Sequence, residues 1–139
     1  MKRLLLIAFI LPLAVAAQKP IKPSLPKAEK ALRDGAFDEA KAIIDATVTS
    51  EKFATNAKAW YLKGLIYAGI DTTKNQQYKS LVENPFAEAK AAFDKANELD
   101  KGKSASFVND ATGFPMLTDQ VNAYFAQNYF DKALKAYQD

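Results

Sequence analysis

From residue 27 onward, apolar side chains recur at the spacing of one helix face, and this period constrains the fold more than any other feature. Apolar residues return after three or four positions, as along the buried face of an α-helix, whereas the alternation typical of strands is absent. The pattern breaks at Gly35, at a polar stretch over 71–84 and at a glycine-containing segment over 101–116. We therefore expect an all-α chain, with helices over about 27–34, 37–46, 56–67, 85–99, 117–125 and 130–137.

These expected helices fall into pairs whose second members are alike. Segments 35–40, 85–89 and 128–133 share a short motif that ends in alanine, and a larger apolar residue follows each alanine four positions later. The aligned alanines are Ala40, Ala89 and Ala133, and the larger residues are Ile44, Phe93 and Tyr137. Internal similarity of this kind is typical of a repeat architecture.

The middle repeat carries the most specific pattern. Its first helix has Trp60, Gly64 and Tyr67 at the spacing W-x₃-G-x₂-Y. Its second helix has Ala89 and Phe93, followed by Ala96. In these positions the chain resembles the tetratricopeptide repeat family. The resemblance is to an exported bacterial member whose degenerate repeats carry insertions.

The resemblance implies antiparallel helix pairs stacked as a short solenoid, with repeats over about 24–56, 57–101 and 114–139, the last one incomplete. Gly64 and Ala89 would be small because the two helices of a pair cross there, and Trp60 would be buried between helices. Two residues depart from the family pattern: Lys63 stands at a leucine position and Lys101 at a proline position. The repeats are also longer than the 34 residues of the family, so we expect insertions within 68–84 and 101–116.

The first 17 residues have the plan of a secretory signal peptide. Met1-Lys2-Arg3 is a basic start, Leu4 begins an apolar stretch, and the stretch ends in small residues before Ala17. Cleavage after Ala16 or Ala17 would give a periplasmic or extracellular protein. The alternative is a membrane anchor, but the stretch is shorter than the ~20 residues that a spanning helix needs. A proline- and lysine-rich lead-in over 18–26 then precedes the helical domain over 27–139.

Composition argues against several kinds of chemistry. The chain has no cysteine and no histidine, so disulfides, thiolate or imidazole metal sites and Ser-His-Asp catalysis are excluded. The formal charge of +3 includes two residues of the leader, and the remaining lysines form no aromatic-bearing basic face, so we expect no nucleic-acid binding. We expect no enzyme activity, no cofactor and no metal.

Two acidic patterns are candidate sites. Asp71 opens a segment that resembles the start of a calcium loop, but Gln76 and Val82 stand where glycine and glutamate are required, so a polar turn is expected. Carboxylates that are close in sequence, such as Asp38 and Glu39, are expected on a solvated helix face, because two-carboxylate chemistry needs a cleft between them.

The tetratricopeptide resemblance implies a concave partner surface formed by the first helices of the repeats. By spacing, that surface would contain Lys58, Tyr61, Leu65, Leu25 and Glu29. The carboxylate-binding clamp of some family members is not expected, because Leu25, Tyr61 and Thr118 stand at its positions.

The function predicted from the sequence is therefore an exported, non-enzymatic module that presents a curved helical surface to a protein or peptide partner. Its last helices hold more aromatic side chains than two neighbours can cover, so we also expect self-association through the C-terminal helix, or a continuation of the array. Two alternatives stay open: the helical scaffold of a carbohydrate-uptake (SusD-like) binding protein, against which the missing lipidation cysteine argues, and a carboxylate-dependent enzyme.

Overall fold

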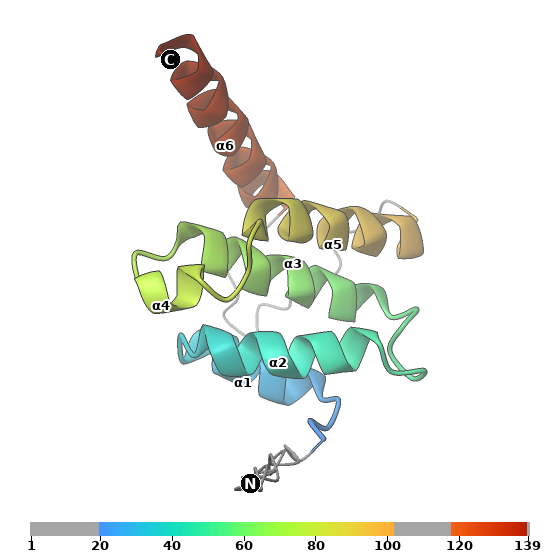
Figure 1. Ribbon diagram of the computed structural model, residues 1–139. Coiled ribbons are helices and arrows are strands. Elements are labelled where there is room, and N and C mark those ends of the chain that lie inside the picture. Colours follow the sequence, from blue (N-terminus) through green and yellow to red (C-terminus); the bar gives the residue numbers. More distant parts are fainter. Residues whose placement is uncertain (1–19, 102–117, 139) are drawn as a thin grey trace, which may run out of the picture.

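The computed structural model describes residues 20–101 and 118–138 (Figure 1). These residues form helices only, with no strand: α1 (Leu25–Arg33), α2 (Phe37–Val48), α3 (Ala57–Thr72), α4 (Gln76–Lys79), α5 (Pro85–Leu99) and α6 (Thr118–Gln138). The expected all-α class is thus confirmed for this part of the chain. The predicted signal peptide and most of the expected loop over 101–116 lie outside the described residues.

Polar caps set the starts of the main helices. The side chains of Ser24, Asn56 and Asn84 accept hydrogen bonds from the backbone N–H groups of the first turns of α1, α3 and α5. These bonds satisfy donors that have no partner inside the helix. α1 therefore begins at Leu25, inside the stretch expected as an extended lead-in. It ends before Gly35, whose φ of 71° suits glycine.

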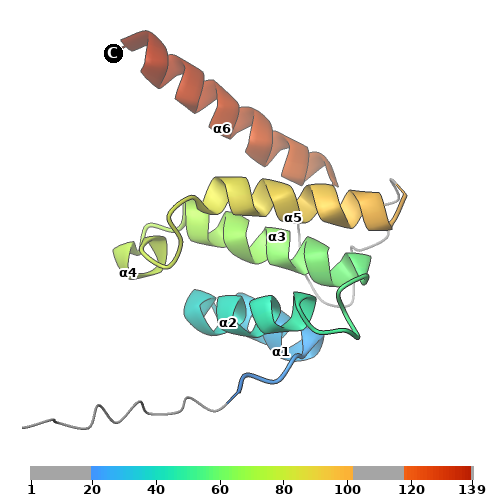
Figure 2. The same cartoon turned by 45° about the vertical axis from the view of Figure 1, so that its right-hand side comes forward.

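The helices lie in layers. α1 and α2 pack together, α3 lies against α2, and α5 lies along α3. α1, α2, α3 and α5 thus form two neighbouring pairs joined through α2 and α3 (Figure 1). The short helix α4 belongs to the connection between α3 and α5, within the stretch expected to be polar and irregular. In both views α6 lies beyond α5, and its C-terminal end points away from the other helices (Figure 2).

The core lies between these layers. Ile44 of α2 and Ile66 and Ile70 of α3 are fully buried. Thr47 is also fully buried, and its hydroxyl donates to the Ile43 carbonyl at 2.7 Å and accepts from the backbone N–H of Ser24 at 2.9 Å. A buried hydroxyl must find such partners, and these bonds fasten the start of α1 to α2.

Two glycines allow close helix contacts. A Cβ atom on Gly64 would lie 2.7 Å from the ring of Phe93, so the expectation that α3 and α5 approach closely at this glycine is confirmed. Gly69 faces the ring of Phe37 in the same way, across the gap between α3 and α2. This second contact was not expected from the sequence.

The expected burial of Trp60 needs correction. Its side chain is only partly buried, although it packs against the core. The indole N–H donates to the carbonyl of Ala54 at 2.8 Å. Trp60 is therefore only partly buried, and its polar atom finds a partner in the turn before α3.

The expected last repeat is also wrong in its details. Instead of two helices over 117–125 and 130–137, the chain forms the single helix α6. Residues 126–129 contain neither glycine nor proline, and the side chains of Gln127 and Asn128 make hydrogen bonds at the i,i+4 spacing of one helix, to Asp131 and to the Tyr124 carbonyl. Ala133 is exposed, so it does not occupy the buried position of Ala40 and Ala89.

Candidate interaction site

Two of the five residues expected on the partner surface, Lys58 and Glu29, form an ion pair between α3 and α1, and a third, Leu25, lies one turn before Glu29 on α1. The ammonium of Lys58 lies 3.0 Å from Glu29, whose side chain is 12% exposed. Leu25 is partly buried and packs against the core. The structure thus brings together an ion pair between the two first helices and a neighbouring apolar residue. Their contact with a partner stays a prediction.

Tyr61 and Leu65 are not presented on a surface. Their side chains are 5% and 8% exposed, and the ring of Tyr61 lies edge-on to Phe93 with centroids 5.3 Å apart. Burial raises the pKa of the Tyr61 phenol. The expectation was wrong for these two residues, because α5 packs along α3 and an aromatic side chain of α5 contacts Tyr61.

A polar cluster that the sequence did not predict lies between α2 and α3. The Asp45 carboxylate accepts from Lys41 at 2.9 Å and pairs with Lys63 at 3.2 Å. The Tyr67 hydroxyl donates to the same carboxylate at 2.8 and 2.9 Å. Lys63 occupies the leucine position of the family pattern, and its pairing with Asp45 explains that departure.

The electrostatics of this cluster follow from its partners. Burial favours a raised pKa for Asp45, but the hydrogen bonds from Lys41 and Tyr67 and the charge of Lys63 outweigh burial and lower the pKa of this carboxyl. The pKa of Tyr67 is raised by burial and by the hydrogen bond to Asp45. At neutral pH the carboxylate is ionised and the phenol is neutral, so the cluster links α2 to α3 through an ion pair and hydrogen bonds.

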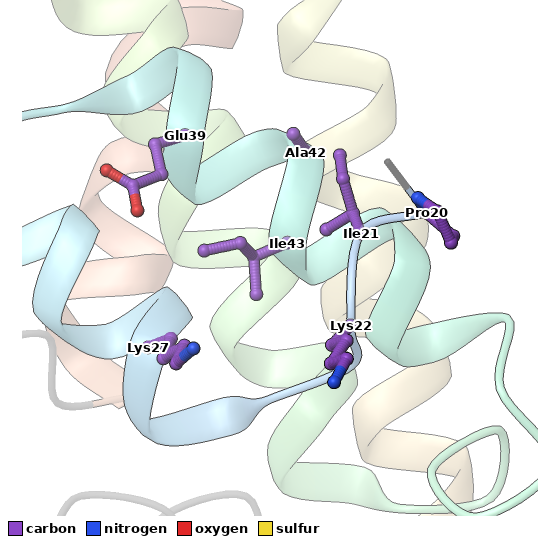
Figure 3. Close-up of a pocket in the computed structure, with 7 residues that line it drawn as sticks. All are labelled: Pro20, Ile21, Lys22, Lys27, Glu39, Ala42 and Ile43. Atoms are coloured by element: carbon purple, nitrogen blue, oxygen red, sulfur yellow. The ribbon is translucent and has the colours of Figure 1, made fainter. Parts of the chain in front are cut away.

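A hollow of about 520 Å³ lies beside α1 and α2 (Figure 3). It is lined by Pro20, Ile21, Lys22, Lys27, Glu39, Ala42 and Ile43. Glu39 is its one carboxylate, so these residues cannot perform acid–base chemistry that requires a carboxylate pair. Among the described residues, no group of three metal-ligating side chains comes together.

The first half of α6 docks on α5 through aromatic rings. Phe86 of α5 contacts Tyr124, Phe125 and Tyr129, with ring centroids between 5.4 and 5.9 Å apart. The Tyr124 hydroxyl donates to Asp71 at 2.8 Å, which ties α6 to the end of α3. These contacts cover one side of α6.

The opposite side of α6 is apolar as well and has no neighbour among the described residues. Phe130 is 63% exposed, Leu134 44% and Tyr137 90%. At 100° per residue they lie on one stripe with three exposed alanines. We call this stripe the outer face of α6; it consists of Ala123, Ala126, Phe130, Ala133, Leu134 and Tyr137.

An exposed apolar stripe of this kind is a candidate interaction surface. Crowded aromatic residues were expected here from the sequence, but not their division between two sides of the helix. The structure separates them, with Tyr124 and Phe125 packed inward and Phe130 and Tyr137 exposed.

No protein-family model, curated protein or solved structure matches the chain. Within residues 20–101 and 118–138, no helix has both the length and the apolar character needed to cross a membrane. The case for a function therefore depends on the residues and surfaces described above.

Proposed function

We propose that the chain is an exported, non-enzymatic interaction module of tetratricopeptide type, which binds a protein or peptide partner through an exposed helical surface. The outer face of α6 is the observation that carries this proposal. Export is inferred from the charged start, apolar stretch and small residues of segment 1–17.

The helix arrangement supports a tetratricopeptide-type fold. α1 with α2 and α3 with α5 are neighbouring pairs, and α2 packs on α3. Gly64 and Phe93 occupy the crossing point of the second pair, as the resemblance implies. Ala40, Ala89 and Ala96 are each fully buried, in keeping with small packing positions. Stacked pairs of this kind give a rigid support for a binding surface.

The outer face of α6 suits a partner that contributes an apolar helix or strip. Its three large side chains stand on a preformed helix, so binding would lose less conformational entropy than ordering a flexible segment. Large aromatic residues also dominate the energy of many protein interfaces. The ion pair of Lys58 with Glu29 lies on other helices and is the second surface to which a partner could extend.

Site-specific photo-crosslinking tests the proposal. A benzophenone-bearing phenylalanine analogue replaces Phe130 in one version of the full chain and Lys90, an exposed residue of α5, in the control version. Both are expressed in the source cells and irradiated. We expect a discrete protein adduct at position 130 that is much stronger than any adduct at position 90.

The masses of the adducts decide the outcome. An adduct with another protein or with a second copy of the chain supports the interaction module. Equal, diffuse labelling at both positions, or no adduct at position 130, contradicts it.

A further inference from the structure

Over residues 122–138 of α6, the charged residues lie on one side of the helix. Between Asn122 and Gln138 the charged residues are Asp131, Lys132 and Lys135. At 100° per residue, all three lie roughly a right angle or more from the centre of the outer face. The outer face is therefore bordered by Asn122, Gln127 and Gln138, which are polar and uncharged. Over residues 122–138, a second identical helix would therefore meet no like charge on this face.

The order of large and small residues on this face is complementary to itself. If two copies of α6 run antiparallel about a two-fold axis at Phe130, residues whose numbers are equally far from 130 face each other. Ala126 then faces Leu134, and Ala123 faces Tyr137, so an alanine leaves room for each large side chain. Phe130 meets its own copy at the axis. Such an isologous contact closes with two chains.

We infer that two copies of the chain pair through the outer faces of their α6 helices, antiparallel and centred on Phe130. This inference rests on the proposed function, because it names a second copy as the protein partner. The C-terminal half of α6 points away from the other helices, which leaves room for the second chain (Figure 2).

The exposed area is consistent with a weak, concentration-dependent dimer. At about 200 Å² for a large side chain, the exposed fractions of Phe130, Leu134 and Tyr137 amount to roughly 400 Å² on each copy. With the alanines and the flanking residues, the pair approaches the ~1,000 Å² at which specific interfaces begin. We expect the dimer fraction to increase with concentration.

Cysteine cross-linking tests the pairing and its direction, and the chain has no native cysteine to interfere. Chains carrying Ala126→Cys are mixed with chains carrying Leu134→Cys and oxidised. In the proposed dimer these positions face each other, so the mixed disulfide forms. Two Ala126→Cys chains alone would hold their cysteines about 12 Å apart along the axis, beyond the reach of a disulfide.

Two controls accompany this experiment. Lys135→Cys lies on the other side of α6 and reports random collisions. Light scattering on the full chain measures the dimer directly. Phe130→Glu should abolish the concentration dependence of the mass, because it places two carboxylates at the axis, whereas Lys135→Glu should leave it unchanged. Circular dichroism checks that Phe130→Glu keeps its helical content.

Each outcome has one meaning. Cross-linking in the mixture at least several-fold above that of either single variant, together with a dimer sensitive to Phe130→Glu, supports the inference. Self-linking of Ala126→Cys as strong as that of the mixture overturns the antiparallel register. A monomer at every concentration overturns the pairing. The proposed function is then tested separately, by whether position 130 photo-crosslinks to another protein.

Discussion

Replacing Gly64 by alanine tests how closely α3 and α5 approach each other. The new Cβ atom would lie 2.7 to 2.8 Å from three ring atoms of Phe93, well inside normal van der Waals contact. The Phe93 ring cannot easily move, because it is 4% exposed and packs edge-on against Tyr61 and Phe125. Overpacking of this kind costs about 1–3 kcal/mol.

A second effect opposes this cost. Alanine is favoured over glycine in a helix interior by about 1 kcal/mol. We therefore expect Gly64→Ala to lower the free energy of unfolding by about 1 kcal/mol overall. Helix propensity alone would instead raise the free energy of unfolding by about 1 kcal/mol. The sign of the change therefore distinguishes the two effects.

Urea unfolding, followed by circular dichroism and by the fluorescence of Trp60, measures this change. Ala91→Gly on the exposed side of α5 is the matched control, because it reports the propensity difference without a packing contact. In a Phe93→Leu background the clash is relieved, and Gly64→Ala should become stabilising. If Gly64→Ala stabilises the native chain by as much as Ala91→Gly destabilises it, the close contact between Gly64 and the Phe93 ring is contradicted.

Three further predictions concern other parts of the chain. The pKa of Asp45 is lowered in the folded chain. Its contribution to stability is therefore present above the ordinary pKa of about 3.9 and is lost as the pH falls through the lower folded pKa. Asp45→Asn should reduce the loss of unfolding free energy at acid pH, measured by urea unfolding across this range. Asn84→Ala should lower the free energy of unfolding by about 0.5–2 kcal/mol, measured by urea unfolding, because it removes the cap of α5. The intact mass of the exported protein should show a first residue of Ala17 or Gln18, and a product that retains Met1 would contradict signal cleavage.

The helices of the first two pairs could be predicted because local signals agree with the apolar period. Asn56 and Asn84 cap the helices that follow them, and Gly35 ends α1. Each signal acts within a few residues of the chain, so no knowledge of tertiary contacts is needed. The Gly64–Phe93 contact could also be predicted, because the family pattern relates these two positions.

The partner surface and the last helix were predicted less well, because both depend on contacts between distant residues. Tyr61 follows the surface spacing of the pattern, but its ring packs against Phe93 of α5. In the last segment, the similarity of 128–133 to 35–40 suggested a new helix start. The segment 35–40 contains a glycine at its start, whereas residues 126–129 contain no helix breaker.

The polar cluster around Asp45 shows a different limit of sequence reasoning. Tyr67 and Asp45 are separated by 22 residues, and their hydrogen bond exists only because α2 packs on α3. Lys63 at a leucine position was the single local signal. It marked a departure from the family pattern, but the sequence alone could not identify the carboxylate that pairs with this lysine.

The residues that hold α6 on the rest of the fold are not those of its outer face. The rings of Tyr124 and Phe125 and the bond to Asp71 hold α6 on α5 and α3, and none of these residues belongs to the outer face. Phe130 and Tyr137, in contrast, contribute most of the exposed apolar area and little to the core. A helix that is apolar on two opposite sides needs a neighbour on each side to remove both from water. α5 covers one side in the described chain, so the hydrophobic effect favours any partner that covers the other, and the uncharged border of the outer face allows that partner to be a second copy.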